Sequence, residues 1–208
     1  MPCKHVVGTG ALLDWAVAAW REAAPALEIR PVRLDQDRLH AFDLRVLDDL
    51  ANGDGTTAFA ACDPQFLNFR RFELMGELKA RGFSMPALVC PGAIVAATAV
   101  VGENAVIGAG AIVGHGCHVG FNAFIGAGAN LGSASRIGSS AWIEAGVLVG
   151  RDVKIGANTT IGHGVIVADA LTIGKLCIID RPGKLTHGVA PRTFIHDGFD
   201  HPIIIVEQ

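Results

Sequence analysis

The stretch that decides the fold begins at Ala105 and reads AVIGAGAIVGHGCHVGFNAFIGAGANLGSASRIG, ending at Gly138. Within it, and beyond it on both sides, an aliphatic residue stands at every sixth position. The full series is Val89, Val95, Val101, Ile107, Val113, Val119, Ile125, Leu131, Ile137, Ile143, Val149, Ile155, Ile161, Val167, Ile173 and Ile179. A period of six matches neither a helix nor a flat strand, and it predicts a β-solenoid.

Each six-residue unit is expected to form one short strand and one corner that is opened by Gly or Asn. Its aliphatic side chain points inward onto the copies in neighbouring coils. Asn104, Asn122 and Asn158 recur at multiples of eighteen residues, and asparagine tolerates the positive φ of such corners. Three units therefore make one triangular coil, and the whole series predicts about five coils.

Composition indicates a compact globular protein. A chain of 208 residues can hold two modest domains, and a formal net charge of −3 predicts no nucleic-acid partner. The apolar residues of the repeat are interrupted by Gly and polar residues every few positions, so no membrane partner is predicted. The start of the chain lacks a signal-peptide pattern, and five scattered cysteines are interpreted as buried thiols, so the predicted location is cytoplasmic.

The first 86 residues lack the six-residue repeat and show a different sequence pattern. Strands are expected at residues 4–7, 27–34 and 57–62, and helices at about 11–21 and 65–81. Gly8-Thr9-Gly10 links the first strand to the first helix, which is a Rossmann-like arrangement, although Leu13 replaces the third glycine of the dinucleotide motif. The glycine turn therefore either holds a nucleotide ligand or only makes a tight bend.

The predicted protein is mainly β with an α/β N-terminal domain. Residues 1–86 form the small Rossmann-like domain, residues 87–183 the solenoid, and residues 184–208 a C-terminal cap or tail. The apolar end of the tail, Ile203 to Val206, is expected to be a strand rather than a helix.

A small Rossmann-like domain, a helix, Gly82-Phe83 and then an unbroken hexapeptide repeat resembles the bacterial nucleotide-amino-sugar N-acetyltransferases and their sialic-acid O-acetyltransferase relatives. The resemblance covers about residues 4–165. It implies a left-handed parallel β-helix and a homotrimer with its active site between subunits. It also implies acetyl transfer from acetyl-CoA to the amine of a nucleotide-linked amino sugar, without a metal.

The family's catalytic motif is His, an acidic residue, Cys, any residue, an aliphatic residue and Gly. The matching stretch here is HGCHVG, residues 115–120, which places His115 at the position of the general base. An attacking amine must lose a proton, and an imidazole takes one up near neutral pH. Two family positions differ, because Gly116 replaces the acid and Phe124 replaces a second histidine that helps to bind the donor.

Predicted ligand contacts follow from the same resemblance and from the columns of the repeat. Acyl-CoA is expected along the later coils, where small corner residues admit the pantetheine chain. The outward basic column of His118, Arg136 and Lys154 suits phosphates, or else a solvated or subunit-facing surface. The donor residues are Phe124, Ala127, Trp142, Ala145 and Lys154, and those for the nucleotide sugar are Gly8, Thr9, Gly10, Asp35 and Asp63.

Two outward apolar columns need partners. Phe124 and Trp142 stand one coil apart, and trimer packing or docking of the small domain competes with stacking on a ligand base. A second column, which Asn130 interrupts, suits the interface of a closed homotrimer. It consists of Ile94, Ile112, Leu148 and Ile166.

Two other functions stay open. The γ-type carbonic anhydrases share the solenoid and bind zinc through three histidines. Here the distance in sequence from His115 to His163 is not a multiple of eighteen residues, so His163 is expected at a different corner. That family also lacks the N-terminal domain. The differences at Gly116 and Phe124 favour the other alternative, a catalytically degenerate sugar-nucleotide-binding or scaffold protein.

Overall fold

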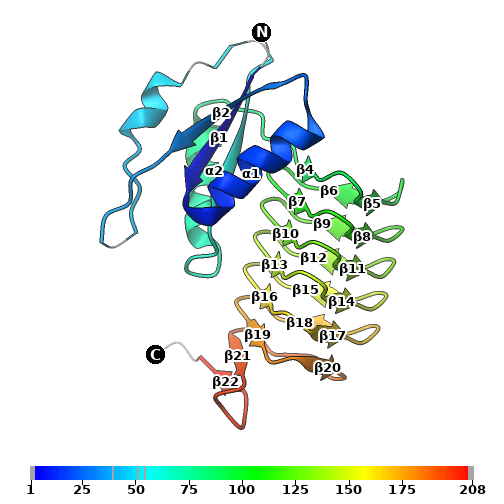
Figure 1. The fold of residues 1–208 in the computed structure, drawn as a ribbon. Helices are drawn as coiled ribbons and strands as arrows, with labels where there is room; N and C mark the ends of the chain where they lie inside the picture. The colour runs from blue at the N-terminus through cyan, green and yellow to red at the C-terminus, as the bar shows by residue number, and fades with distance from the viewer. Residues whose placement is uncertain (1–2, 39, 51, 54, 206–208) are drawn as a thin grey trace.

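A computed structural model describes residues 3–205 except 39, 51 and 54. Figure 1 shows a small α/β domain lying against the upper part of a tall solenoid, with the C-terminus at the far end of the coils. The predicted fold class, mainly β with an α/β N-terminal domain, is confirmed. No helix among these residues is long and apolar enough to cross a membrane.

The small domain is a parallel sheet of three strands in the order β2-β1-β3, between helices α1 and α2. Its elements are β1 (Cys3–Thr9), α1 (Gly10–Ala23), β2 (Glu28–Arg33), the 3₁₀-helix η1 (Arg45–Asp49), β3 (Thr57–Cys62) and α2 (Phe69–Ala80). Sequence reasoning missed η1. Helix α2 also begins later than predicted, because Phe66, Leu67 and Asn68 adopt positive φ, which a right-handed helix cannot include.

The solenoid has three parallel sheets, here numbered in chain order. Sheet 1 contains β4 (Leu88–Val89), β7 (Val106–Ile107), β10 (Phe124–Ile125), β13 (Trp142–Ile143), β16 (Thr160–Ile161) and β19 (Ile178–Asp180). Sheet 2 contains β5 (Ile94–Val95), β8 (Ile112–Val113), β11 (Asn130–Leu131), β14 (Leu148–Val149), β17 (Val165–Val167) and β20 (Gly183–Leu185). Sheet 3 contains β6 (Val100–Val101), β9 (His118–Val119), β12 (Arg136–Ile137), β15 (Lys154–Ile155) and β18 (Thr172–Ile173).

The register between coils is eighteen residues, as predicted, as far as the pairing of β17 with β20. Phe124 pairs with Trp142 on sheet 1, Asn130 with Leu148 on sheet 2, and Arg136 with Lys154 on sheet 3. The inward aliphatic residues stack into one continuous buried core. Every outward column that the sequence predicts is therefore present.

The glycine that follows most inward residues has a different role from the one predicted. It does not adopt the positive φ of the corner, which falls three residues after the inward residue, as at Asn104. A Cβ at Gly126 would lie 2.5 Å from the backbone nitrogen of Ala145 on the next coil, and the other glycines of this position have similar clashes. Glycine is needed there because adjacent coils approach closely, not because the backbone turns.

At the corner between sheets 3 and 1, a buried polar ladder joins the coils to the small domain. The Asn104 amide donates to Asn122 Oδ1 at 2.8 Å, and the Asn122 amide donates to Ser140 Oγ at 3.0 Å. Asn104 also pairs with both backbone groups of Ala60 in β3. These side chains thus supply the corner conformation and, in addition, the polar contacts of the domain junction.

Arg71 of α2 lies at the centre of this junction and is completely buried. Its guanidinium donates to three backbone carbonyls, those of Ala60, Asn104 and Asn122, at 2.7–3.1 Å. Burial lowers the pKa of Arg71 to about 10. One side chain therefore links a strand of the small domain to two successive coils.

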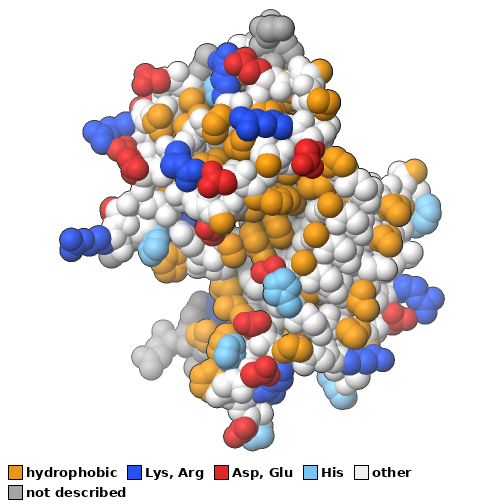
Figure 2. Space-filling model, in the orientation of Figure 1, with side chains coloured by type: hydrophobic (Ala, Val, Ile, Leu, Met, Phe, Trp, Pro, Cys, Tyr) orange, Lys and Arg blue, Asp and Glu red, His pale blue; other side chains and the backbone are white. Residues whose placement is uncertain are grey.

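Aromatic packing closes the same junction beside α1. The rings of Phe124 and Trp142 stack at 4.0 Å, and Trp15 of α1 packs edge-on against Phe124 at 5.9 Å. Figure 2 shows hydrophobic side chains gathered along this seam. Of the explanations left open for the two aromatic residues, docking of the small domain is the one that the fold realises.

The C-terminal segment closes the lower end of the solenoid with strands, as predicted. Strand β21 (Thr193–His196) extends sheet 1 in parallel to β19, and β22 (Ile203–Ile204) pairs antiparallel with β21. Val206, the last residue of the predicted strand, lies outside the described residues.

We expect Arg71→Met to lower the free energy of unfolding by about 3–5 kcal/mol, because the buried carbonyls of Asn104 and Asn122 lose the donor that Arg71 supplies, while Ala60 keeps only the Asn104 amide. Urea denaturation of the full chain measures the change. Arg70→Met is the matched control, since Arg70 pairs at the surface with Glu73 and such a pair contributes less than about 1 kcal/mol. Equal stability of the two variants would contradict this role of Arg71.

A second buried cation makes stability depend on pH. Lys4 Nζ donates to Thr57 Oγ1 at 2.8 Å and lies 4.0 Å from the Trp20 ring centroid. Burial lowers the pKa of Lys4 to about 8, whereas an unfolded lysine titrates near pH 10.4. Between these values the unfolded state binds more protons, so the Lys4 contribution to stability rises with pH.

We therefore expect the stability difference between wild type and Lys4→Met to move in favour of the wild type as pH rises from about 8 to about 10. The change is on the order of 1 kcal/mol per pH unit. Urea denaturation of both proteins at each pH measures this change. Both proteins contain the same buried cysteines, so the titration of the thiols affects both equally and cancels in the difference. A constant difference over this range would contradict the lowered pKa of Lys4.

Candidate active site

His115 lies at the exposed corner between sheets 2 and 3, between β8 and β9. Its Nδ1 is 3.1 Å from Thr98 Oγ1 on the preceding coil, and the Gly116 amide donates to the same oxygen at 3.0 Å. Within the described chain no partner is recorded for Nε2, which is therefore available to a ligand. The position suits a general base, because one nitrogen is held and the other is free.

The neighbouring coils supply no carboxylate at this corner. The same corner comprises residues 96–99 on the coil before and residues 132–135 on the coil after, and neither segment contains Asp or Glu. Thr98 is the polar side chain that contacts His115 instead. Sequence reasoning missed Thr98, although its position, one coil before Gly116, was available from the eighteen-residue period.

Cys117 is close to His115 in sequence but points into the coil. Its thiol is completely buried, donates to the Gly132 carbonyl at 3.1 Å, and has a pKa raised by burial. A thiol of this kind is a poor nucleophile. The site thus offers a base without a reactive thiol beside it.

The predicted donor residues fall in three places on one chain. Ala127 and Ala145 lie at the corner between sheets 1 and 2, and Lys154 lies on sheet 3. Helix α1 lines one side of the corner that contains Ala127. Trp15 and Glu22 of α1, with Ala109 and Ala127 of the solenoid, line a hollow of about 180 Å³ there. No single surface of one chain brings the three places together.

Phe124 and Trp142 form the third place, under the small domain. Trp142 is buried, and its indole N–H donates to Glu144 Oε1 at 2.8 Å. Phe124 is half-buried between Trp15 and Trp142. Docking of the small domain occupies both rings, and donor binding by them stays a prediction.

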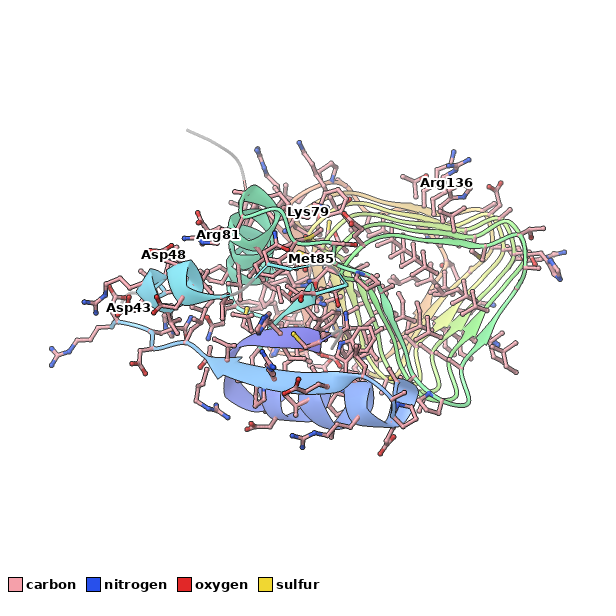
Figure 3. All side chains as sticks on the ribbon, turned by 90° about the horizontal axis from the view of Figure 1, so that it is seen from above. Asp43, Asp48, Lys79, Arg81, Met85 and Arg136 are labelled. Carbon is pink, nitrogen blue, oxygen red and sulfur yellow. The ribbon has the colours of Figure 1, made fainter. Side chains whose placement is uncertain are left out.

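Lys154 belongs to a groove of about 930 Å³ between α2 and sheet 3. Arg136 and Lys154 stand there on adjacent coils, and Glu103, an acid in the wall of the groove, pairs with Lys79 at 2.8 Å. In Figure 3, which looks along the solenoid, Arg136 points outward on the side of the coils where Lys79 lies. The groove therefore presents cations to an anionic ligand.

An acid–histidine pair that sequence reasoning missed lies beside Ala145. The Nδ1–H of His163 donates to the Ala145 carbonyl at 3.2 Å, and its Nε2 lies 3.5 Å from Glu144 Oε2. The eighteen-residue period could have predicted that His163 lies next to Ala145, since the two residues are one coil apart. His163 and His115 occupy different corners, as the sequence predicted, and no cluster of three metal-ligating side chains occurs among the residues described.

The predicted nucleotide-sugar residues meet at one edge of the small sheet. Gly8, Thr9 and Gly10 lie at the carboxyl end of β1, and Asp35 and Asp63 follow β2 and β3. Their binding role stays a prediction.

Asp63 already fills the N-terminus of α1. Its carboxylate accepts from the amides of Ala11 and Leu12 at 3.1 and 2.8 Å. A Cβ on Gly10 would lie 2.1 Å from this carboxylate, so the glycine makes room for the cap. Because the helix amides are paired with an anion, a phosphate bound at this edge has to lie away from them.

The bacterial transferase hexapeptide (six repeats) model matches residues 98–133 and 134–169. The chain is similar to PerB from Caulobacter crescentus in complex with CoA and GDP-perosamine, at a TM-score of 0.76 and 21% identity over 93% of both chains. It is also similar to the acetyltransferase domain of PglB from Neisseria gonorrhoeae in complex with acetyl coenzyme A, at a TM-score of 0.65 and 19% identity over 98% of this chain and 100% of that one.

A third similar structure is WeeI from Acinetobacter baumannii, at a TM-score of 0.51 and 14% identity over 98% of this chain and 100% of that one. No curated protein matches the chain. These likenesses confirm the repeat and the two-part fold that the resemblance implied, over nearly the whole chain.

Proposed function

We propose that the protein is an acetyl-CoA-dependent N-acetyltransferase that acts on the amine of a nucleotide-linked amino sugar. The observation that carries the proposal is the free Nε2 of His115 at an exposed corner of a hexapeptide-repeat solenoid. The ligands in the similar structures support it, since the PerB complex holds CoA and GDP-perosamine and the PglB domain holds acetyl coenzyme A.

We further propose a homotrimer with sheet 2 facing the threefold axis. Sheet 1 is partly covered by the small domain and sheet 3 is charged, whereas the outward residues of sheet 2 include exposed aliphatic side chains. These are Ile94, Ile112, Leu148 and Ile166, which are 61%, 38%, 45% and 39% exposed. A closed ring of heterologous contacts about a threefold axis covers such a surface.

This arrangement explains why the predicted donor residues are separated on one chain. Each solenoid is a triangular prism, and in the trimer its sheet 2 faces the threefold axis. The corner between sheets 1 and 2 of one subunit then lies beside the corner between sheets 2 and 3 of the next subunit. Ala127 and Ala145 of one copy then face His115 of its neighbour, and Lys154 lies on the neighbour's adjoining sheet. The donor site is complete only in the assembled protein.

In the proposed reaction the acceptor amine attacks the thioester carbonyl of acetyl-CoA, and His115 Nε2 takes the amine proton. The carbonyl oxygen becomes an oxyanion, which backbone amides of the small-residue corner stabilise. Collapse of the tetrahedral intermediate breaks the carbon–sulfur bond, and the imidazolium returns the proton to the CoA thiolate. The buried Cys117 takes no part, so the acetyl group passes directly between the two substrates.

The proposed location is the cytoplasm. The cysteines are all free and buried, which fits a reducing compartment.

We expect His115→Ala to lower turnover by about 10²- to 10⁴-fold, the usual contribution of a positioned base. The measurement is thiol release from acetyl-CoA in the presence of UDP-, GDP- and dTDP-linked 4-amino sugars. His118→Ala is the matched control, and it should change the KM for acetyl-CoA more than turnover. If the wild type binds the sugar nucleotide but releases no thiol, the result would favour a catalytically degenerate binding protein. Gly116, which replaces the acidic residue of the family motif, is consistent with that alternative.

We expect the wild type to sediment as a trimer at micromolar concentration and the double variant Ile112→Glu/Ile166→Glu to sediment as a monomer. Burying two unpaired carboxylates per subunit is strongly unfavourable. The variant should also lose at least about 100-fold in turnover, because each site needs two subunits. Val46→Glu, at a similarly exposed residue of the small domain, is the control. A monomeric wild type would contradict the assembly.

A further inference from the structure

The imidazole of His115 has two nitrogens, and the one that accepts a proton is determined by what the other one contacts. Nδ1 faces Thr98 Oγ1 at 3.1 Å. If Nδ1 carries the hydrogen and donates it to this oxygen, Nε2 keeps its lone pair and is the base. If the hydroxyl donates instead, Nε2 carries the hydrogen and has no lone pair to offer.

The Gly116 amide orients the Thr98 oxygen. Its N–H donates to Oγ1 at 3.0 Å, so the oxygen is held between the amide and the imidazole. A hydroxyl oxygen has two lone pairs, and it can accept from the amide and from Nδ1–H together while its own hydrogen turns towards solvent. On its own chain Thr98 is exposed, so its hydroxyl hydrogen is able to turn away from the imidazole.

We infer that Thr98 is a positioning residue, which accepts the Nδ1–H of His115 and thereby leaves Nε2 free as the base. The inference rests on the proposed function for its catalytic consequence and on hydrogen-bond geometry alone for its effect on the imidazole. A neutral hydroxyl contacts Nδ1, and the adjoining corner segments, residues 96–99 and 132–135, contain no Asp or Glu. Thr98, one coil before Gly116, thus orients the proposed base from within the same subunit.

The same arrangement is maintained through the proposed proton transfer. When Nε2 gains a proton, Nδ1–H still donates to Thr98, so no hydrogen bond has to be exchanged during the reaction. A hydroxyl offers the imidazolium a dipole instead of a full negative charge, and charge-assisted bonds to carboxylates are roughly twice as strong. We therefore expect Thr98 to act mainly through orientation and choice of tautomer.

The first test needs no substrate. The tautomer of His115 is read from the ring nitrogen shifts of the full-length protein labelled with ¹⁵N-histidine, and the His115→Gln spectrum identifies its signals. The wild type should show the Nδ1–H form, and Thr98→Val, which keeps the shape but lacks the hydroxyl, should shift it towards the Nε2–H form. Thr98→Ser should retain the wild-type spectrum. A Thr98→Val spectrum with the His115 signals unchanged would overturn the inference, whether or not the protein is active.

The second test is a double-mutant cycle on turnover. Thr98→Val should lower kcat about tenfold with little change in KM, which is the loss expected for one hydrogen bond to the base. In the His115→Ala background the same substitution should have no further effect, since residues that act as a unit are not additive. Equal losses in both backgrounds would show that Thr98 acts on the fold of the corner and would overturn its link to His115.

Ser133→Ala is the matched control for both tests. Ser133 occupies the same corner on the following coil, and no bond between its hydroxyl and His115 is recorded in the described structure. It should leave the His115 spectrum and kcat within about twofold of the wild type. Failure of the proposed function appears separately, as absent thiol release by a wild type whose His115 tautomer still responds to Thr98→Val.

Discussion

The structure depends on one constraint, which is that each coil of the hexapeptide repeat, up to β20, must repeat after eighteen residues. The step from β19 to β21 is shorter, at sixteen residues. Backbone hydrogen bonds run from each strand to the strand of the next coil, so an inward side chain always meets another inward side chain. The buried core and the outward columns both follow from this register. A residue is thus placed on a named sheet and coil by its number alone.

Close approach of the coils is the second consequence of this register. The glycine after the inward residue is required where its Cβ would strike the backbone of the following coil, as at Gly126 and Gly138. Positive φ occurs three residues after most inward residues, where Gly, Asn, Ala and Ser are all found, although Thr98 does not adopt it. The two requirements are physically distinct, although both favour glycine in the sequence.

Attachment of the small domain uses the solenoid's own corner. Asn104 and Asn122 hold the turn, bond to each other, and offer their carbonyls to the buried Arg71. The Phe124–Trp142 stack fills the other side of the junction under α1. Two other surfaces lie beside it: the aliphatic face of sheet 2, on which the proposed subunit contact lies, and the basic groove between α2 and sheet 3, which contributes Lys154 to the proposed donor site.

The sequence by itself determined the solenoid, its coil length, its columns and the corner position of His115, because a strict six-residue period leaves no freedom in which residues face the core. It also placed the strands and helices of the small domain to within a few residues. Only the tertiary structure decided that Phe124 and Trp142 lie under α1, that Asp63 caps that helix, and that Arg71 joins the two parts. These contacts connect segments that no period relates, such as α2 with the coils, so their residue types carried no signal of their partners. Thr98 falls between the two cases, since its place beside His115 follows from the register while its hydrogen bond depends on the geometry of the corner.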